Sequence, residues 1–176
     1  MRGSKKDPQQ YRAYRWENEL TSWAGAHATP AQLRRVVKKC CRMYRVPVPR
    51  VHCLTKNQRD GKRYTSEYDP NEHVIRIRPR HYDLCTAVHE SAHAITDWLF
   101  GIWTDHKPHG PEWLGVYMVL LDRLKIIPRI ALEAHARAMG LEFYAPQLIA
   151  PRQVRKRFRR RVKFANRERR MLRLWT

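Results

Sequence analysis

With 176 residues and a hydrophobic content of 43%, the chain is long enough for one domain that has a packed core and terminal extensions. Its 36 Lys and Arg outnumber its 16 Asp and Glu to give a net charge of +20, which predicts a polyanionic partner, nucleic acid first and an anionic membrane surface second. No run approaches the roughly 18 apolar residues of a membrane span, and no apolar segment follows the charges of residues 1–7, so the composition excludes a membrane-spanning protein and argues against a secreted one.

The cysteines give a second indication of the compartment. They are Cys40, Cys41, Cys53 and Cys85, and they contain no CxxC pair, so the sequence does not predict a zinc ribbon. Three of them fall at apolar positions of predicted elements, as reduced core thiols do. We therefore expect a cytoplasmic protein, or one associated with a nucleoid or nucleus.

The N-terminal part of the chain predicts two helices after a disordered start at residues 1–10. Residues 11–28 are rich in aromatic and charged side chains, and the aromatic residues are expected to pack on the domain. The second helix begins with Thr29 as the N-cap and Pro30 at the first position. Its apolar residues have helical spacing, and its opposite face is basic, which usually means solvent exposure and here makes phosphate contact a second interpretation. This basic face consists of Arg34, Arg35, Lys38, Lys39 and Arg42.

Three short strands are predicted next, at residues 50–55, 62–68 and 72–78, because apolar and polar side chains alternate there. Turn-forming residues separate the second and third strands at Asp69-Pro70-Asn71, and others lie at residues 59–61. We expect a small three-stranded antiparallel sheet. The third strand is expected to point Ile75 and Ile77 inward and Arg76 and Arg78 outward.

The next segment, residues 81–100, has apolar residues at helical spacing and contains His89-Glu90-Ser91-Ala92-His93. Residues four apart lie on one face of a helix, so His89 and His93 can share one metal ion while Glu90 reaches a water molecule beside it. A helix with two ordinary polar residues on its solvent face is the alternative. The apolar stripe beside the histidines favours the metal site, with zinc as the expected ion.

Two more helices are predicted, one that begins at Pro111 and ends before Pro128 and one at about residues 129–139 that ends at Gly140. A catalytic zinc usually has three protein ligands and one open position. The third ligand should come from this later part of the chain. The candidates are His106, His109, Glu112 and Glu133.

From residue 152 the composition changes, since residues 152–176 hold twelve Lys or Arg residues and one acidic residue, Glu168. This basic tail, with residues 146–151 leading into it, is expected to contact nucleic acid and to become ordered on a partner. The predicted contact residues are Arg152, Arg155, Lys156, Arg157, Arg159, Arg160, Arg161 and Lys163. The expected organisation is an N-terminal extension at 1–28, a domain at 29–145 and the tail at 146–176.

The combination of the HExxH pentad with His109-Gly110-Pro111-Glu112-Trp113 resembles the SprT-like metalloprotease family, which includes the Spartan proteases that cleave proteins crosslinked to DNA. The resemblance covers roughly residues 30–125. It implies an α+β fold, a minimal zincin-like domain in which a helix and a three-stranded sheet precede the HExxH helix and further helices. The chain departs from many relatives because it lacks their C-terminal cysteine zinc ribbon.

The resemblance also implies roles for the site residues. His89, His93 and His109 would bind Zn²⁺, with His109 preferred over His106 because it alone has the Gly-Pro-Glu-aromatic context. Glu90 would be the general base, and zinc would lower the pKa of its water toward ~7. Asp97 is a candidate to orient His93, although an ordinary solvated side chain is the alternative. Tyr117 and His106 are weak candidates for stabilising the oxyanion.

The sequence, the resemblance and the basic charge together predict a zinc endopeptidase that is recruited to nucleic acid, and the resemblance implies that this is DNA and that the substrates are proteins bound there. The alternative is a non-catalytic nucleic-acid-binding or assembly protein that retains the zincin fold and its zinc. A general base such as Glu90 argues against it, because a structural site needs none. A membrane-surface hydrolase that uses the basic tail is a weaker third possibility.

Overall fold

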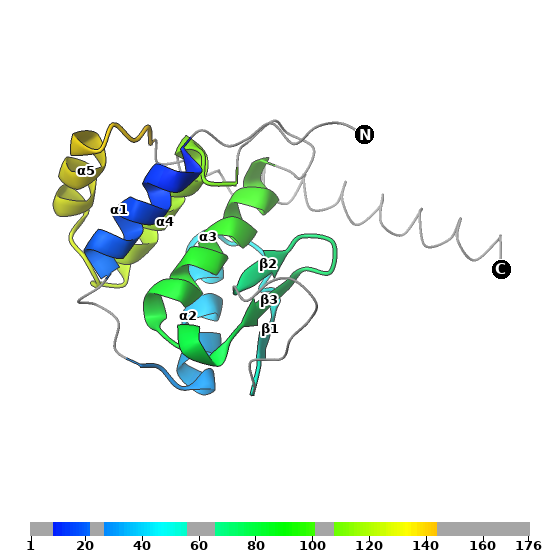
Figure 1. Ribbon diagram of the computed structural model, residues 1–176. Coiled ribbons are helices and arrows are strands. Elements are labelled where there is room, and N and C mark those ends of the chain that lie inside the picture. Colours follow the sequence, from blue (N-terminus) through cyan, green and yellow to red (C-terminus); the bar gives the residue numbers. More distant parts are fainter. Residues whose placement is uncertain (1–8, 22–26, 56–65, 101–107, 144–176) are drawn as a thin grey trace, which may run out of the picture. The chain divides into compact units, whose positions relative to one another are not determined.

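The computed structural model describes residues 9–21, 27–55, 66–100 and 108–143, and these form an α+β fold, as the sequence predicts (Figure 1). The predicted basic tail and its eight contact residues, His106 and the turn at 59–61 lie outside the described residues. The helices are α1 (Gln10–Thr21), α2 (Pro30–Met43), α3 (Leu84–Phe100), α4 (Pro111–Arg123) and α5 (Arg129–Ala138). The strands are β1 (Arg50–Cys53), β2 (Glu67–Asp69) and β3 (Val74–Ile77), and a 3-10 turn, η1 (Pro79–His81), precedes α3.

The sheet has the strand order β1-β3-β2 and is mixed rather than fully antiparallel. β2 and β3 form the predicted hairpin, in which Asp69 Oδ1 accepts hydrogen bonds from the N–H groups of Asn71 and Glu72. β1 instead lies parallel to β3, with Val51 opposite Ile75. The prediction was wrong in this detail because short alternating strands have the same pattern in either direction. The most apolar strand, β3, takes the centre and leaves β2 at one edge.

The predicted outward row of arginines on β3 is also corrected. Arg76 forms ion pairs with three carboxylates of the same hairpin, at 3.2 Å to Asp69, 3.6 Å to Glu67 and also to Glu72. Arg78 is buried. The hairpin therefore neutralises Arg76 internally, and this row is not a free basic surface.

Helix α2 has the start that its sequence predicts. Thr29 and Gln32 form a reciprocal capping box, in which Thr29 Oγ1 accepts from the Gln32 N–H and Gln32 Oε1 accepts from the Thr29 N–H. The helix buries Leu33, Val37, Cys40 and Cys41. These residues pack toward α3, where the Cys40 thiol lies beside Ser91. Burial raises the pKa of Cys40 and Cys41 to about 12, so both are inert core thiols.

Helices α4 and α5 begin at the positions that their prolines predict. Pro111 occupies the first turn of α4, and α5 begins after Pro128. The chain then leaves α5 through Gly140, whose φ of +63° is a left-handed conformation that glycine adopts without strain. Trp113 and Tyr117 are fully buried on the inner face of α4.

Helix α1 is an integral part of the same packed unit (Figure 1). It buries Ala13 and Trp16 completely and leaves Tyr11 exposed. Gln9, at its start, donates from Nε2 to the carbonyl oxygens of His109 and Glu142, both at 3.0 Å. Within the described ranges, no helix is long and apolar enough to cross a membrane.

Candidate metal centre

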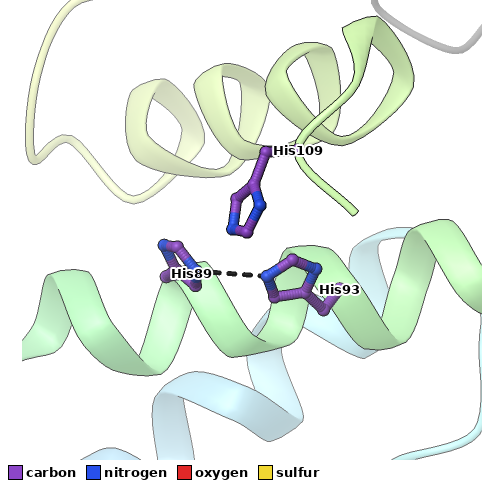
Figure 2. Close-up of side chains that lie close together, drawn as sticks. All are labelled: His89, His93 and His109. Atoms are coloured by element: carbon purple, nitrogen blue, oxygen red, sulfur yellow. Dashed lines mark hydrogen bonds between the residues drawn. The ribbon is translucent and has the colours of Figure 1, made fainter. Parts of the chain in front are cut away.

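Helix α3 brings the two histidines of the pentad together on one face. His89 and His93 are four residues apart, and their Nε2 atoms lie 3.1 Å from each other. Figure 2 shows both rings rising from the same side of α3. His89 is buried and His93 is partly exposed. The helical spacing in the sequence therefore produces the paired imidazoles that a metal site requires.

His109 comes to this pair from the segment that leads into α4. Its ring centroid lies 5.4 Å from that of His89 and 4.8 Å from that of His93, and Figure 2 shows its ring above the two others. The hydrogen bond from Gln9 to the His109 carbonyl fixes its backbone. Gly110, in an extended conformation, and Pro111 then begin α4, so the chain turns sharply at the histidine.

The three histidines fit a metal ion. One ring nitrogen from each lies within 4.8 Å of the others, and in the part of the chain that the structure describes they form the cluster suited to a metal. Tetrahedral zinc with Zn–N bonds of 2.0–2.1 Å needs ligand nitrogens about 3.3 Å apart, close to the 3.1 Å between His89 and His93. Three imidazoles suit zinc, copper, iron or nickel, so the donor set supports a metal without fixing which one.

The other predicted third ligands have different surroundings. Glu133 pairs with Arg129 at 2.5 Å and with Arg137 at 3.0 Å on α5. Glu112 lies in the first turn of α4, where a carboxylate interacts favourably with the helix dipole. Neither belongs to the histidine cluster. Among the described candidates, only His109 does.

A carboxylate from α1 holds the first histidine. Glu17 Oε2 lies 2.9 Å from His89 Nδ1, and its Oε1 lies 3.0 Å from the same nitrogen. The Tyr117 hydroxyl donates to Glu17 Oε1 at 2.6 Å. Burial raises the pKa of Glu17, but the charge of His89 and the hydrogen bonds from His89 and Tyr117 outweigh burial and lower the pKa of Glu17 from its ordinary value of 4.5. Burial likewise lowers the pKa of His89, and the Glu17 carboxylate outweighs it and raises the pKa to about 9.

This contact assigns Tyr117 a place different from the predicted one. Its ring is fully buried, and its hydroxyl is engaged by Glu17. A hydroxyl in that position supports the carboxylate behind His89 rather than an oxyanion in the cleft. Asp97 is buried and accepts a hydrogen bond from the Tyr68 hydroxyl at 3.2 Å, and its role beside His93 stays a prediction.

The centre opens into a cleft of about 1100 Å³. Glu90, His89, His93 and His109 line it together with residues of α1, β2 and the segment before α3. Burial raises the pKa of Glu90 to about 7, and the backbone N–H of Tyr68 donates a hydrogen bond to its carboxylate. A carboxyl group in such surroundings can both accept and release a proton near neutral pH.

Aromatic rings enclose the histidines. Trp113 lies against all three, with centroid distances of 4.8 Å to His89, 5.2 Å to His93 and 4.7 Å to His109. Tyr14 of α1, on the cleft side, lies 4.6 Å from His109. These rings restrict the orientations of the imidazoles and exclude water from one side of the centre.

The sequence did not identify Glu17 or Tyr14 as site residues. Both lie outside the region covered by the SprT-like resemblance. A metal-binding histidine usually donates its second N–H to a carboxylate, so such a partner could be expected. Which carboxylate it is depends on the tertiary packing of α1 against α3, and the sequence does not indicate that packing.

Comparisons with known proteins add no family to these observations. No family model matches the chain. No curated protein and no solved structure matches it either. The geometry of the centre is therefore the main structural indication of what the protein does.

Proposed function

We propose that this protein is a zinc endopeptidase of the SprT-like type that acts on proteins bound to nucleic acid. One observation carries the proposal, the convergence of His89, His93 and His109 in a cleft that Glu90 also lines. The order of helix, three strands and HExxH helix is the order expected for a minimal zincin-like domain. The sequence motif of His109, Gly110 and Trp113, which carries the resemblance to that family, supports the proposal.

The proposed chemistry divides between the metal and one carboxylate. Zinc, when bound by the three histidines, would supply Lewis acidity at the scissile carbonyl and acidify the attacking water. Glu90 would accept the proton of that water on its carboxylate and later deliver the proton to the leaving amine. The hydrogen bond from the Tyr68 backbone N–H holds the Glu90 side chain in place for both transfers.

The cleft suits an extended polypeptide. Strand β2 is at an edge of the sheet, and its residues Glu67 and Tyr68 line the cleft beside Glu90. An edge strand of a sheet can bind a peptide as a further strand. Backbone pairing of this kind binds many sequences, so selection of substrates would come from where the protein is located.

The charge of the chain supplies that location. A net charge of +20 favours binding to phosphates with little sequence preference, and such affinity falls steeply as salt rises. The substrates would then be proteins held on the same nucleic acid.

The experiment measures metal content and the cleavage of casein and histones, with and without DNA, for the native chain and Glu90→Gln. The native chain should contain one zinc ion and cleave, whereas Glu90→Gln should keep the metal and lose roughly 10²- to 10⁴-fold in rate. Metal binding without cleavage by the native chain under any nucleic-acid condition would contradict the proposal. That result would favour the non-catalytic zinc-containing alternative.

A further inference from the structure

Helix α2 presents an unusual exposed face. Five of its residues are exposed and basic, and the remaining exposed positions of the helix, Ala31 and Gln32, are uncharged. The basic residues are Arg34, Arg35, Lys38, Lys39 and Arg42, called the α2 basic face below. At 100° per residue they cover an arc of about 140° that lies opposite the buried side chains of the helix.

The α2 basic face differs from three other arginine-bearing surfaces, on which carboxylates pair with the arginines. Arg15 pairs with Glu19 at 2.9 Å on α1, Arg137 pairs with Glu133 at 3.0 Å on α5, and Arg76 is surrounded by carboxylates on the β2–β3 hairpin. Helix α2 contains no acidic residue, and within the described ranges none of its five basic side chains forms an ion pair. The usual local compensation is therefore missing on this helix.

The spacing of these charges along α2 destabilises the helix. Arg34 and Lys38, Arg35 and Lys39, and Lys38 and Arg42 are three like-charged pairs at i and i+4, an arrangement that destabilises a helix. A solvated helix face normally carries charges of both signs. The five cations of this face repel one another, and a bound polyanion would neutralise them. The face is therefore suited to binding a polyanion.

We infer that the α2 basic face is a binding surface for the phosphodiester backbone of nucleic acid. Arginine guanidinium groups donate in a planar fork that matches phosphate oxygens, and lysines add mobile point charges. The inference rests on the proposed recruitment to nucleic acid and assigns part of it to the folded domain, in addition to the tail.

An anionic membrane fits this surface less well. Helices that bind a membrane surface insert an apolar face into the headgroup region. Four apolar residues of α2, Leu33, Val37, Cys40 and Cys41, are fully buried in the protein core. On the accessible side, the one exposed apolar residue of α2 is Ala31, and Val36 and Met43 are half-buried, so this side has no exposed large apolar side chain to insert.

The position of the α2 basic face is compatible with proteolysis. The buried side of α2 packs toward α3, with Cys40 beside Ser91, and Ser91 projects from α3 away from the face of His89 and His93 because two helical residues differ by about 200°. The described residues that line the cleft include none from α2. Nucleic acid bound to α2 would leave the cleft open to a protein substrate.

The test compares two triple variants of the full chain that remove the same charge. Arg34→Gln/Lys38→Gln/Arg42→Gln removes one ridge of the α2 basic face. Arg15→Gln/Arg129→Gln/Arg137→Gln removes three exposed cations that are each paired with a glutamate. Affinity for a duplex DNA and for a structured RNA is measured by fluorescence anisotropy at salt concentrations from about 50 to about 300 mM, a range in which phosphate contacts dominate the affinity.

The α2 variant should bind either nucleic acid on the order of 10- to 100-fold more weakly at physiological salt, with its salt slope reduced by about 2.7, since each phosphate contact contributes roughly 0.9. The control variant should keep the native slope. Loss of affinity on only one of the two probes would assign the surface to DNA or to RNA. Thermal unfolding verifies the fold, and the α2 variant should be at least as stable as the native chain because like-charge repulsion is relieved.

Equal losses in the two variants would overturn the inference, because binding would then follow total charge rather than this face. Unchanged DNA and RNA binding together with lost binding to phosphatidylserine vesicles would overturn it in favour of a membrane surface. Metal content and cleavage of a free peptide are measured on the same samples. Failure of the proposed endopeptidase activity would appear in those two readouts, and failure of the α2 surface would leave them unchanged.

Discussion

Glu17 on α1 and His89 on α3 are 72 residues apart in the chain, and Glu17 Oε2 lies 2.9 Å from His89 Nδ1. A carboxylate at this distance accepts the Nδ1–H, so the imidazole presents its other nitrogen, Nε2, toward His93. The N-terminal helix therefore orients a ligand that the HExxH pentad supplies. A metal centre built from α3 and the start of α4 depends on α1 for its geometry.

Glu17→Gln should weaken zinc binding by about 10- to 100-fold, because the amide orients the imidazole less well than the carboxylate and does not increase its basicity. The matched control is Glu19→Gln on the same helix, where the carboxylate is exposed and pairs with Arg15 and His135. Competition with a chelator gives both affinities. Equal affinities for Glu17→Gln and the native chain would show that α1 does not support the centre.

Tyr117→Phe should destabilise the fold by about 1–3 kcal/mol, because it removes a buried donor from a charged acceptor. Its effect on zinc affinity should be smaller than that of Glu17→Gln, since the carboxylate remains. Tyr44→Phe is the control, because Tyr44 is a buried tyrosine whose hydroxyl makes no hydrogen bond to a described residue. Denaturant unfolding measures both, and a Tyr117→Phe variant as stable as Tyr44→Phe would contradict the assigned hydrogen bond.

The buried thiols predict a loss of stability at alkaline pH. Burial raises the pKa of Cys40 from 9.0 to about 12, so the unfolded chain releases this proton before the folded protein does. The stabilisation is complete below pH 9 and is lost as the pH rises from 9 toward 12, by about 1.4 kcal/mol per pH unit for one thiol. Unfolding free energies measured from pH 8 to 11 should show this decline. Cys40→Ala should reduce its slope, and identical slopes would contradict the assignment.

Two left-handed positions give a matched prediction about the backbone. Gly140 has a φ of +63°, and a Cβ there would lie 3.2 Å from Arg12 Nη1, so Gly140→Ala should destabilise the protein by about 1 kcal/mol. Lys125 has a φ of +59° with a side chain present, so Lys125→Gly should be neutral or stabilising. Thermal unfolding of both variants checks the signs. Destabilisation by Lys125→Gly comparable to that by Gly140→Ala would contradict the backbone explanation.

Local sequence signals predicted the helices and part of the centre. The capping residues Thr29 and Pro30 marked the start of α2, and Pro111 marked the start of α4. The spacing of His89 and His93 placed both on one helix face, and the motif context favoured His109 over His106. Each of these signals depends on residues that lie close together in the chain, which is why they could be interpreted without a structure.

Relationships that depend on tertiary packing could not be predicted. The parallel pairing of β1 with β3 and the burial of Arg78 are tertiary features, and the alternation of side chains within a strand does not indicate either of them. Glu17 was one of several acidic residues near the N-terminus, and nothing in its own sequence context distinguishes it from Glu19. Only the packing of α1 against the centre separates their roles.

The metal stoichiometry of the native chain and two histidine variants tests the three-histidine centre most directly. After equilibration with a slight excess of zinc and removal of free metal, the native chain should retain one ion. His109→Ala should retain little, whereas His135→Ala, which changes a histidine of α5 paired with Glu19, should retain one. Full retention of zinc by His109→Ala would contradict the proposed centre.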